Sequence, residues 1–236
     1  MNKKTAIPLL AAVTLSAGLL SATAHAALIN NGATIYDTDL NISWLADANL
    51  AASNTFGVAG IGASGQMTWY TAQNWIGAMN TANYLGYSDW RLPTVTDTGA
   101  PGCDYWANSG TDCGWNVNTA TGEMAHLYFD ELGNKSYYDT AGNPQAGWGL
   151  ANTGSFSNFQ SNTYWSGTEY APASGGAWGF NTSSGFQNAD GKGFGLFVLA
   201  VRPGQAAAVP EPATAWLLGL GLLSLVSVGW RRLVLW

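Results

Sequence analysis

Charged residues are scarce in this chain of 236 residues, and basic residues are the scarcest of them. Lysine and arginine together number 8, aspartate and glutamate 14, and the four types make up 9% of the sequence. The formal net charge is -6 and the sequence pI is about 4.6. Proteins that bind nucleic acid through its phosphates present a basic surface. The composition therefore excludes nucleic acid as a partner.

The sequence does not lack apolar residues. Hydrophobic residues make up 47% and aromatic residues 13%, with 12 tryptophans. A chain of this composition has enough apolar surface to form a core, which excludes intrinsic disorder. Residues 27–208 are also long enough to fold as one domain without a metal ion or a disulfide.

The N-terminus has the three parts of a secretory signal peptide. Lys3 and Lys4 precede an apolar stretch over residues 6–20, and Ala24-His25-Ala26 has the small-x-small form that signal peptidase cleaves. We predict cleavage after Ala26, so that residues 1–26 form the signal peptide. An uncleaved membrane anchor is the alternative, but the apolar run is short for one.

The C-terminus contains a long apolar segment over residues 213–230, followed directly by Arg231 and Arg232. Eighteen helical residues at about 1.5 Å each extend about 27 Å, close to the thickness of a bilayer core. Apolar residues surround the whole helix axis, which favours a membrane helix over a buried globular one. The positive-inside rule keeps the two arginines cytoplasmic and everything before Pro210 outside.

Residues 209–236 resemble a PEP-CTERM sorting signal, whose parts are the Pro210-Glu211-Pro212 triplet, the apolar helix and the Arg231-Arg232 pair. The resemblance implies recognition by an exosortase in a Gram-negative bacterium and cleavage near the triplet. It further implies passage through an inner-membrane intermediate to the cell surface or extracellular matrix. Residues 27–208 would then be the exported domain.

The only two cysteines, Cys103 and Cys113, both lie in the exported segment. An oxidising compartment favours their pairing as a disulfide, with a free pair as the alternative. Closing so short a loop contributes about 2–3 kcal/mol. Two thiols without nearby histidines fall short of the usual four zinc ligands, so we expect neither a metal nor any other cofactor.

Hydrophobic periodicity predicts helices over residues 68–80 and 123–132. Short β-rich segments predict strands, which makes the expected fold class α+β. The strands are expected at residues 35–36, 42–45, 164–168, 177–181 and 194–202. His126, in the second helix, is expected to be a surface or packing residue because no second histidine follows Ala26. Asp37, Asp39 and Asn41 have the spacing of a calcium loop, but Ile42 and Ala48 occupy its required Gly and Glu positions, which favours a plain turn.

Three separated motifs resemble the Lcl C-terminal domain family. They are Gly86-Tyr87-Ser88-Asp89-Trp90-Arg91-Leu92-Pro93-Thr94, Tyr164-Trp165-Ser166-Gly167-Thr168-Glu169 and Ala200-Val201-Arg202-Pro203, accompanied by Ala177-Trp178. The resemblance extends over residues 35–203. It implies a C-type lectin-like fold with two helices packed on antiparallel strands, found in surface proteins and in adhesins that bind polysaccharides. The Glu-Pro-Asn and Trp-Asn-Asp motifs of calcium-dependent lectins are absent, so calcium-dependent sugar binding is not implied.

Arg91, Glu169 and Arg202 are charged residues inside apolar motifs, where charges are usually paired. We expect a structural ion-pair network that joins the Arg91 turn to the Glu169 strand. The alternative role of Glu169 as a catalytic acid lacks a second placed carboxylate.

The sequence thus favours a non-enzymatic, lectin-like surface or matrix protein that binds extracellular polysaccharide. Trp106, Trp115 and Trp148 lie in glycine-rich loops and are the candidate sugar-stacking residues, although loop anchoring is an equal explanation for them. A purely structural matrix component is the first alternative function, and an extracytoplasmic enzyme is the second. The acidic character of the domain disfavours sulfated or phosphorylated polymers.

Overall fold

The computed structural model describes residues 28–97, 106–109 and 111–204. The predicted signal peptide (1–26), sorting signal (209–236) and Cys103 lie outside these residues. Within them, no helix is both long enough and apolar enough to cross a membrane. Cys113 is buried and is not a free cysteine, but its predicted disulfide with Cys103 stays a prediction.

The first sheet brings together the two ends of the described chain. Its strands β1 (Leu28–Asn30), β2 (Thr34–Asp37), β3 (Ile42–Leu45) and β8 (Val201–Pro203) pair antiparallel in the order β1-β2-β3-β8. The expected turn between β2 and β3 is confirmed. The Asp37 Oδ1 atom accepts hydrogen bonds from the backbone N–H groups of Asp39 and Leu40, at 3.1 and 3.0 Å.

The second sheet is also antiparallel, in the order β4-β7-β6-β5. Its strands are β4 (Gly114–Trp115), β5 (Thr163–Glu169), β6 (Gly176–Asn181) and β7 (Phe186–Gly191). The expected strands at 164–168 and 177–181 are confirmed, but β7 is missed by the sequence patterns because half of its residues are polar (Gln187, Asn188 and Asp190). Within the expected strand at 194–202 only β8 is a strand, and residues before it make isolated bridges such as Met67 with Leu196.

Two helical segments complete the fold. Helix α1 (Trp69–Thr81) begins at Thr68, whose side chain accepts from the Thr71 N–H, and it buries one face that includes Trp75 and Met79. The second expected helix is α2 (Glu123–His126), which continues as the π-helix η4 (Leu127–Glu131). The described part of the chain also contains three short 3-10 turns: η1 (Leu50–Ala52), η2 (Tyr84–Gly86) and η3 (Thr119–Thr121).

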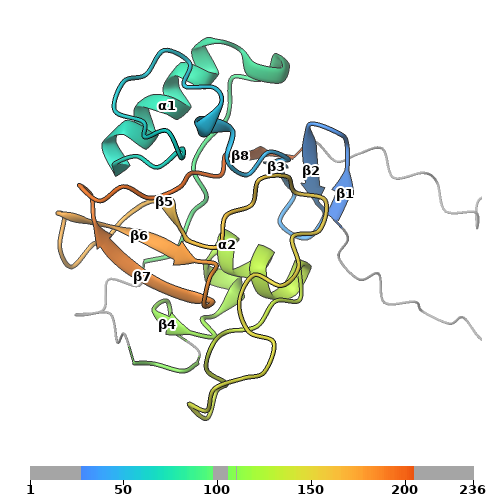
Figure 1. Ribbon diagram of the computed structural model, residues 1–236, viewed down its shortest axis with the longest axis vertical. Coiled ribbons are helices and arrows are strands. Elements are labelled where there is room, and N and C mark those ends of the chain that lie inside the picture. Colours follow the sequence, from blue (N-terminus) through green and yellow to red (C-terminus); the bar gives the residue numbers. More distant parts are fainter. Residues whose placement is uncertain (1–27, 98–105, 110, 205–236) are drawn as a thin grey trace, which may run out of the picture.

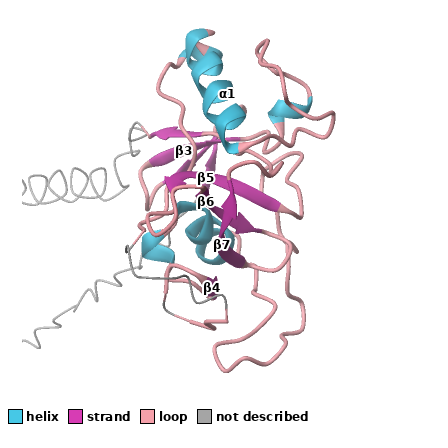
Figure 2. Ribbon diagram, turned by 90° about the vertical axis from the view of Figure 1, so that its left-hand side faces the viewer, coloured by secondary structure: helices cyan, strands magenta, loops and turns pink. Residues whose placement is uncertain are grey.

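A single large hydrophobic cluster includes residues from both sheets and both helical segments. Several tryptophans are fully buried while their indole N–H groups remain hydrogen-bonded: Trp165 donates to the Met67 carbonyl at 2.9 Å, and Trp75 to that of Asn54 at 2.9 Å. The described residues therefore carry a hydrophobic core of their own, as independently folding domains do. Figure 1 shows α1 at one end of the molecule and β4 at the other, and Figure 2 shows the strands between them.

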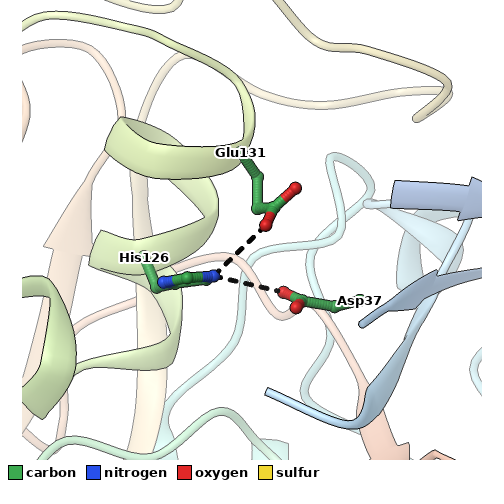
Figure 3. Close-up of side chains that lie close together, drawn as sticks. All are labelled: Asp37, His126 and Glu131. Atoms are coloured by element: carbon green, nitrogen blue, oxygen red, sulfur yellow. Dashed lines mark ion pairs between the residues drawn. The ribbon is translucent and has the colours of Figure 1, made fainter. Parts of the chain in front are cut away.

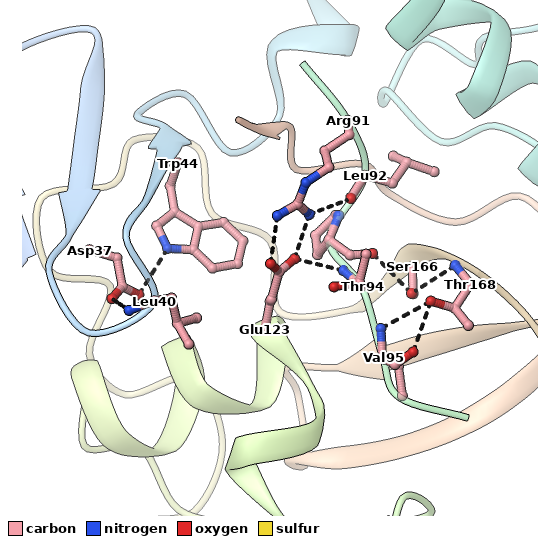
Figure 4. A network of polar contacts seen from close by, with 11 residues as sticks. Asp37, Leu40, Trp44, Arg91, Leu92, Thr94, Val95, Glu123, Ser166 and Thr168 are labelled. Carbon is pink, nitrogen blue, oxygen red and sulfur yellow. Dashed lines mark hydrogen bonds and ion pairs between the residues drawn. The ribbon is translucent and has the colours of Figure 1, made fainter. Parts of the chain in front are cut away.

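The fold class expected from the sequence, α+β with two helices and antiparallel strands, is confirmed. The expected ion-pair network that joins the Arg91 turn to the Glu169 strand does not form among the described residues. The segments of these two residues do lie side by side, but hydrogen bonds join them: Ser166 Oγ donates to the Pro93 carbonyl at 2.9 Å, and Thr168 Oγ1 donates to the Val95 carbonyl at 3.0 Å (Figure 4).

The three charged residues instead belong to three separate ion pairs, each with a partner that the sequence patterns did not indicate. Arg91 pairs with Glu123, Glu169 with Lys192, and Arg202 with Asp89. Lys192 also lies over the Trp69 ring, 4.6 Å from its centroid, and Arg202 lies 3.7 Å from the centroid of Tyr87. The charges therefore connect neighbouring elements in pairs rather than as one network.

Candidate functional site

Trp115 lies in β4, which Figure 1 shows at the end of the molecule opposite α1, and Trp106 contacts its ring. Trp148 lies in the long loop that follows η4. Trp106 is 78% exposed and Trp148 is 45% exposed, which places both among the exposed large hydrophobic side chains. Trp115 differs from them because it is half-buried in β4, opposite Phe186 of β7.

These tryptophans belong to one continuous series of ring contacts. Trp106 lies 6.2 Å from Trp115, Trp115 lies 4.8 Å from Tyr138, Tyr138 lies 4.6 Å from Tyr137, and Tyr137 lies 4.7 Å from Trp148, each measured between ring centroids. We call these five residues the aromatic row. An exposed tryptophan stands at each end of it, and the sequence analysis did not identify its two tyrosines.

The last three steps of the row are edge-to-face contacts with interplanar angles of 83–88°. This is a preferred geometry for aromatic pairs and adds about 0.5–1.5 kcal/mol per pair beyond the burial of area. Phe186 packs on Trp115 from the sheet, with ring centroids 4.5 Å apart. The inner rings therefore fix the position of the exposed ones, which a tryptophan on an unsupported loop would not achieve.

Two side chains hold the loops of the aromatic row together by donating hydrogen bonds to backbone carbonyls. Asn116 Nδ2 donates to the carbonyls of Asn108 and Tyr138, both at 2.9 Å. It therefore connects the segment that follows Trp106 to the segment that contains Tyr138. Gln145 Nε2 donates to the carbonyls of Ser136 and Tyr138 at 3.1 and 2.9 Å. Asparagine and glutamine, typical of loops, are here the residues that order them.

One carboxylate lies directly beside the row. Asp139 follows Tyr138 directly, and its carboxylate accepts backbone N–H bonds from Asn143 at 2.8 Å and Ala141 at 2.9 Å. Backbone hydrogen bonding, above all from Asn143, lowers the pKa of Asp139. The carboxylate is therefore ionised at neutral pH, and it disfavours anionic ligands beside the row.

The other residues considered from the sequence lie elsewhere. His126 is buried rather than at the surface, and three carboxylates surround its ring: those of Asp37, Asp130 and Glu131. Burial and the charge of Asp37 raise the pKa of Glu131, while His126 opposes the shift. Counting histidines in the sequence could not reveal this cluster, because the groups around His126 are carboxylates that come from β2 and η4.

Comparison with known families adds to this picture. Residues 33–202 match the family model described as the Lcl C-terminal domain. The chain belongs to the Lcl C-terminal domain family. In this Lcl C-terminal domain the matched segment includes both sheets except β1 and the end of β8, and it contains the whole aromatic row.

A second match identifies the signal at the end of the chain. Residues 208–232 match the PEP-CTERM protein-sorting motif, as the sequence analysis expected. The motif indicates that this Lcl C-terminal domain is exported and sorted to the surface by an exosortase in a Gram-negative bacterium. A comparison with curated proteins gives no match.

Proposed function

We propose that this Lcl C-terminal domain is a recognition module of C-type lectin-like architecture that binds neutral extracellular polysaccharide on its aromatic row. The observation that carries the proposal is the continuity of the row, with Trp106 and Trp148 exposed at its two ends. Exposed aromatic faces pack against the C–H faces of sugar rings, and binding sites commonly combine such surfaces with a few polar groups.

The chemistry around the row supports a neutral ligand. Asp139 offers carboxylate oxygens to sugar hydroxyl groups beside Tyr138 and repels sulfate or phosphate groups. The calcium-dependent lectin motifs are absent from the sequence, so binding is expected to persist when calcium is removed.

The sorting signal supports the location that this function requires. In the proposed route, signal peptidase removes residues 1–26, the apolar segment at 213–230 holds an inner-membrane intermediate, and exosortase processing delivers the domain to the cell surface or extracellular matrix. A disulfide between Cys103 and Cys113 would suit that oxidising environment and stabilise the loop that contains Trp106.

We also propose that the domain is not an enzyme. Glu169, the carboxylate weighed as a catalytic acid, has its Oε1 atom 2.8 Å from the Lys192 ammonium group, and among the described residues no second carboxylate is placed opposite it as glycoside hydrolysis would need. Its role is better explained as the partner of a buried lysine.

Affinity electrophoresis of residues 28–204 through gels that contain a neutral glucan, a uronic-acid polymer or a sulfated polymer tests the function. We expect retardation by the neutral polymer, with and without a calcium chelator. The double variant Trp106→Ala/Trp148→Ala should bind at least about tenfold more weakly, since loss of an aromatic anchor costs more than about 1 kcal/mol.

Tyr70→Ala is the matched control, because Tyr70 is 59% exposed but lies on α1 at the other end of the molecule. Its binding should equal that of the unaltered domain. If the folded domain is not retarded by any polymer, the proposal fails and a structural matrix role becomes the better explanation.

A further inference from the structure

Three side chains from distant parts of the chain meet in a buried cluster away from the aromatic row. Asp37 comes from the end of β2, His126 from the end of α2, and Glu131 from the end of η4 (Figure 3). His126 Nε2 lies 3.3 Å from Glu131 Oε1 and 3.8 Å from Asp37 Oδ2. The exposed fractions of the three side chains are 0% for Asp37, 9% for His126 and 3% for Glu131.

Two atoms at the centre of this cluster have unused bonding capacity. His126 Nε2 and Glu131 Oε1 are buried, and among the described residues neither has a hydrogen-bond partner. No lysine or arginine of the described chain forms an ion pair with Asp37 or Glu131. Two buried carboxylates with one imidazole carry excess negative charge, which is costly unless a cation compensates it.

The orientation of the histidine ring is fixed from its other side. His126 Nδ1 lies 3.2 Å from Asp130 Oδ2, which leaves Nε2 directed toward Asp37 and Glu131. In metal sites a carboxylate usually holds the second ring nitrogen of a histidine ligand, and Asp130 is near enough to His126 Nδ1 to take that role when a metal is bound.

The π-helix explains how Asp130 and Glu131 both reach the same ring. The Leu132 N–H donates to the Leu127 carbonyl five residues earlier, at 3.0 Å, as in a π-turn. This wider winding brings Glu131, five residues after His126, to the same side of the helix as the imidazole. Such π-segments occur often at functional sites.

Hydrogen bonds to both of its carboxylate oxygens hold the Asp37 side chain at the end of β2. Its Oδ1 atom caps the β2–β3 turn, and its Oδ2 atom accepts from the Trp44 indole N–H at 3.3 Å. The carboxylate therefore presents a second lone pair of Oδ2 toward the histidine without any change of backbone.

We propose that Asp37, His126 and Glu131 bind one divalent transition-metal ion of the zinc type. Two ligand atoms bound at about 2.1 Å to a tetrahedral ion lie about 3.4 Å apart. The distance from His126 Nε2 to Glu131 Oε1, 3.3 Å, agrees with this, and the 3.8 Å to Asp37 Oδ2 requires that carboxylate to approach by a few tenths of an ångström when the ion binds. A neutral imidazole and two carboxylates balance a charge of two, and a nitrogen donor favours zinc over calcium or magnesium. This inference is independent of polysaccharide binding.

The bound ion would tie the first sheet to the second helical segment. Asp130, whose side chain is 47% exposed, and Asp39, which is exposed, add two further carboxylates beside the cluster. The ion is therefore expected to raise the stability of the domain by mass action.

Residues 28–204 permit a clean test because His126 is their only histidine. Isothermal titration of untagged, chelator-treated domain with Zn²⁺ should show one site, and the NMR signals of the single imidazole should move with the same saturation. Glu131→Gln and His126→Gln should each weaken binding at least tenfold. Asp190→Asn, which alters a half-buried carboxylate outside the cluster, should leave the affinity unchanged.

The thermal midpoint distinguishes a metal site from an ordinary ion pair. At the same concentration, Zn²⁺ should raise this midpoint in the unaltered domain and in Asp190→Asn, and clearly less in Glu131→Gln. In the metal-free state Glu131→Gln should melt at a higher temperature, because one of two facing carboxylates is gone. Absence of zinc binding to the unaltered domain, or unchanged affinity in both cluster variants, would overturn the proposal.

Discussion

Arg91 and Glu123, 32 residues apart, form two parallel hydrogen bonds that fasten the Arg91 turn to the start of α2 (Figure 4). Arg91 Nη1 lies 2.7 Å from Glu123 Oε2, and Nη2 lies 2.6 Å from Oε1. Glu123 Oε2 also accepts the Thr94 N–H at 2.7 Å. A bidentate pair of this kind is both directional and strong, and the carboxylate lies in the first turn of the helix, where negative charge is favourable.

We predict that Glu123→Ala lowers the free energy of unfolding by about 2–3 kcal/mol, because it removes three hydrogen bonds to a charged group. Arg91 is about one-third exposed, and solvent around it keeps the loss below that of a fully buried pair. Urea denaturation measures the effect. A loss below about 0.5 kcal/mol would contradict a structural role for this pair.

The pair of Glu169 and Lys192 is asymmetric, and its two partners should respond differently to substitution. The Glu169 side chain is 55% exposed, whereas that of Lys192 is 5% exposed and also donates to the Ser174 carbonyl at 2.7 Å. We predict a loss of about 1 kcal/mol for Glu169→Ala and about twice that for Lys192→Ala, which also removes packing on Trp69. Equal losses in parallel urea curves would contradict this assignment.

The sequence predicts elements held by interactions between near neighbours in the chain better than elements held by distant ones. The β2–β3 turn and helix α1 depend on neighbours within a few residues, such as the Thr68 cap, and their patterns predicted them. Strand β7 is specified by pairing with β6 rather than by its own composition, and it was missed. Elements with local causes are readable from the sequence, and elements imposed by tertiary pairing are not.

The same distinction holds for the charges and the candidate site. The sequence indicates that Arg91 needs a partner but not that the partner is Glu123, because the choice depends on where α2 begins. It indicates that Trp106 and Trp148 lie in loops, but not that Tyr137 and Tyr138 connect them. The carboxylates around His126 meet because the π-helix η4 lies against the end of β2. Hydrophobic periodicity in the sequence does not predict this contact.

Asp190 gives the domain a predicted dependence of stability on pH. Burial raises the pKa of this carboxyl group, and a hydrogen bond from Asn188 partly opposes the shift. A raised pKa means that Asp190 holds its proton more tightly in the folded state than in the unfolded chain. The stability of the domain therefore falls as pH rises above about 3.9, the pKa of aspartate in the unfolded chain. This loss of stability is complete once the pH exceeds the pKa of Asp190 in the folded state.

We therefore expect Asp190→Asn to stabilise the domain at pH 7 by up to about 1 kcal/mol and to have no effect below about pH 3.5. Urea curves at several pH values measure this. The amide keeps an oxygen that can accept from Asn188, so the hydrogen bond is preserved. A gain that is the same at both ends of the pH range would show that charge is not its cause.

Gly114 holds the Trp106 and Trp115 segments together by allowing a very close approach of backbone. Its φ is +96°, and a Cβ atom at this position would lie 2.3 Å from the Ala107 carbonyl oxygen. That carbonyl accepts the Trp115 N–H at 2.9 Å, so the segments cannot separate without losing the bond. We predict that Gly114→Ala costs about 2–3 kcal/mol from backbone strain and steric overlap.

Gly193→Ala is the control for this substitution, because no atom lies within 4 Å of its added Cβ and its φ is not in the left-handed region. It should change the free energy of unfolding by less than about 0.5 kcal/mol. If the aromatic row binds polysaccharide, Gly114→Ala should also weaken binding under conditions where the domain remains folded, because the displaced Trp106 can no longer pack on Trp115. Unchanged binding together with reduced stability would show that Trp106 needs no support from β4.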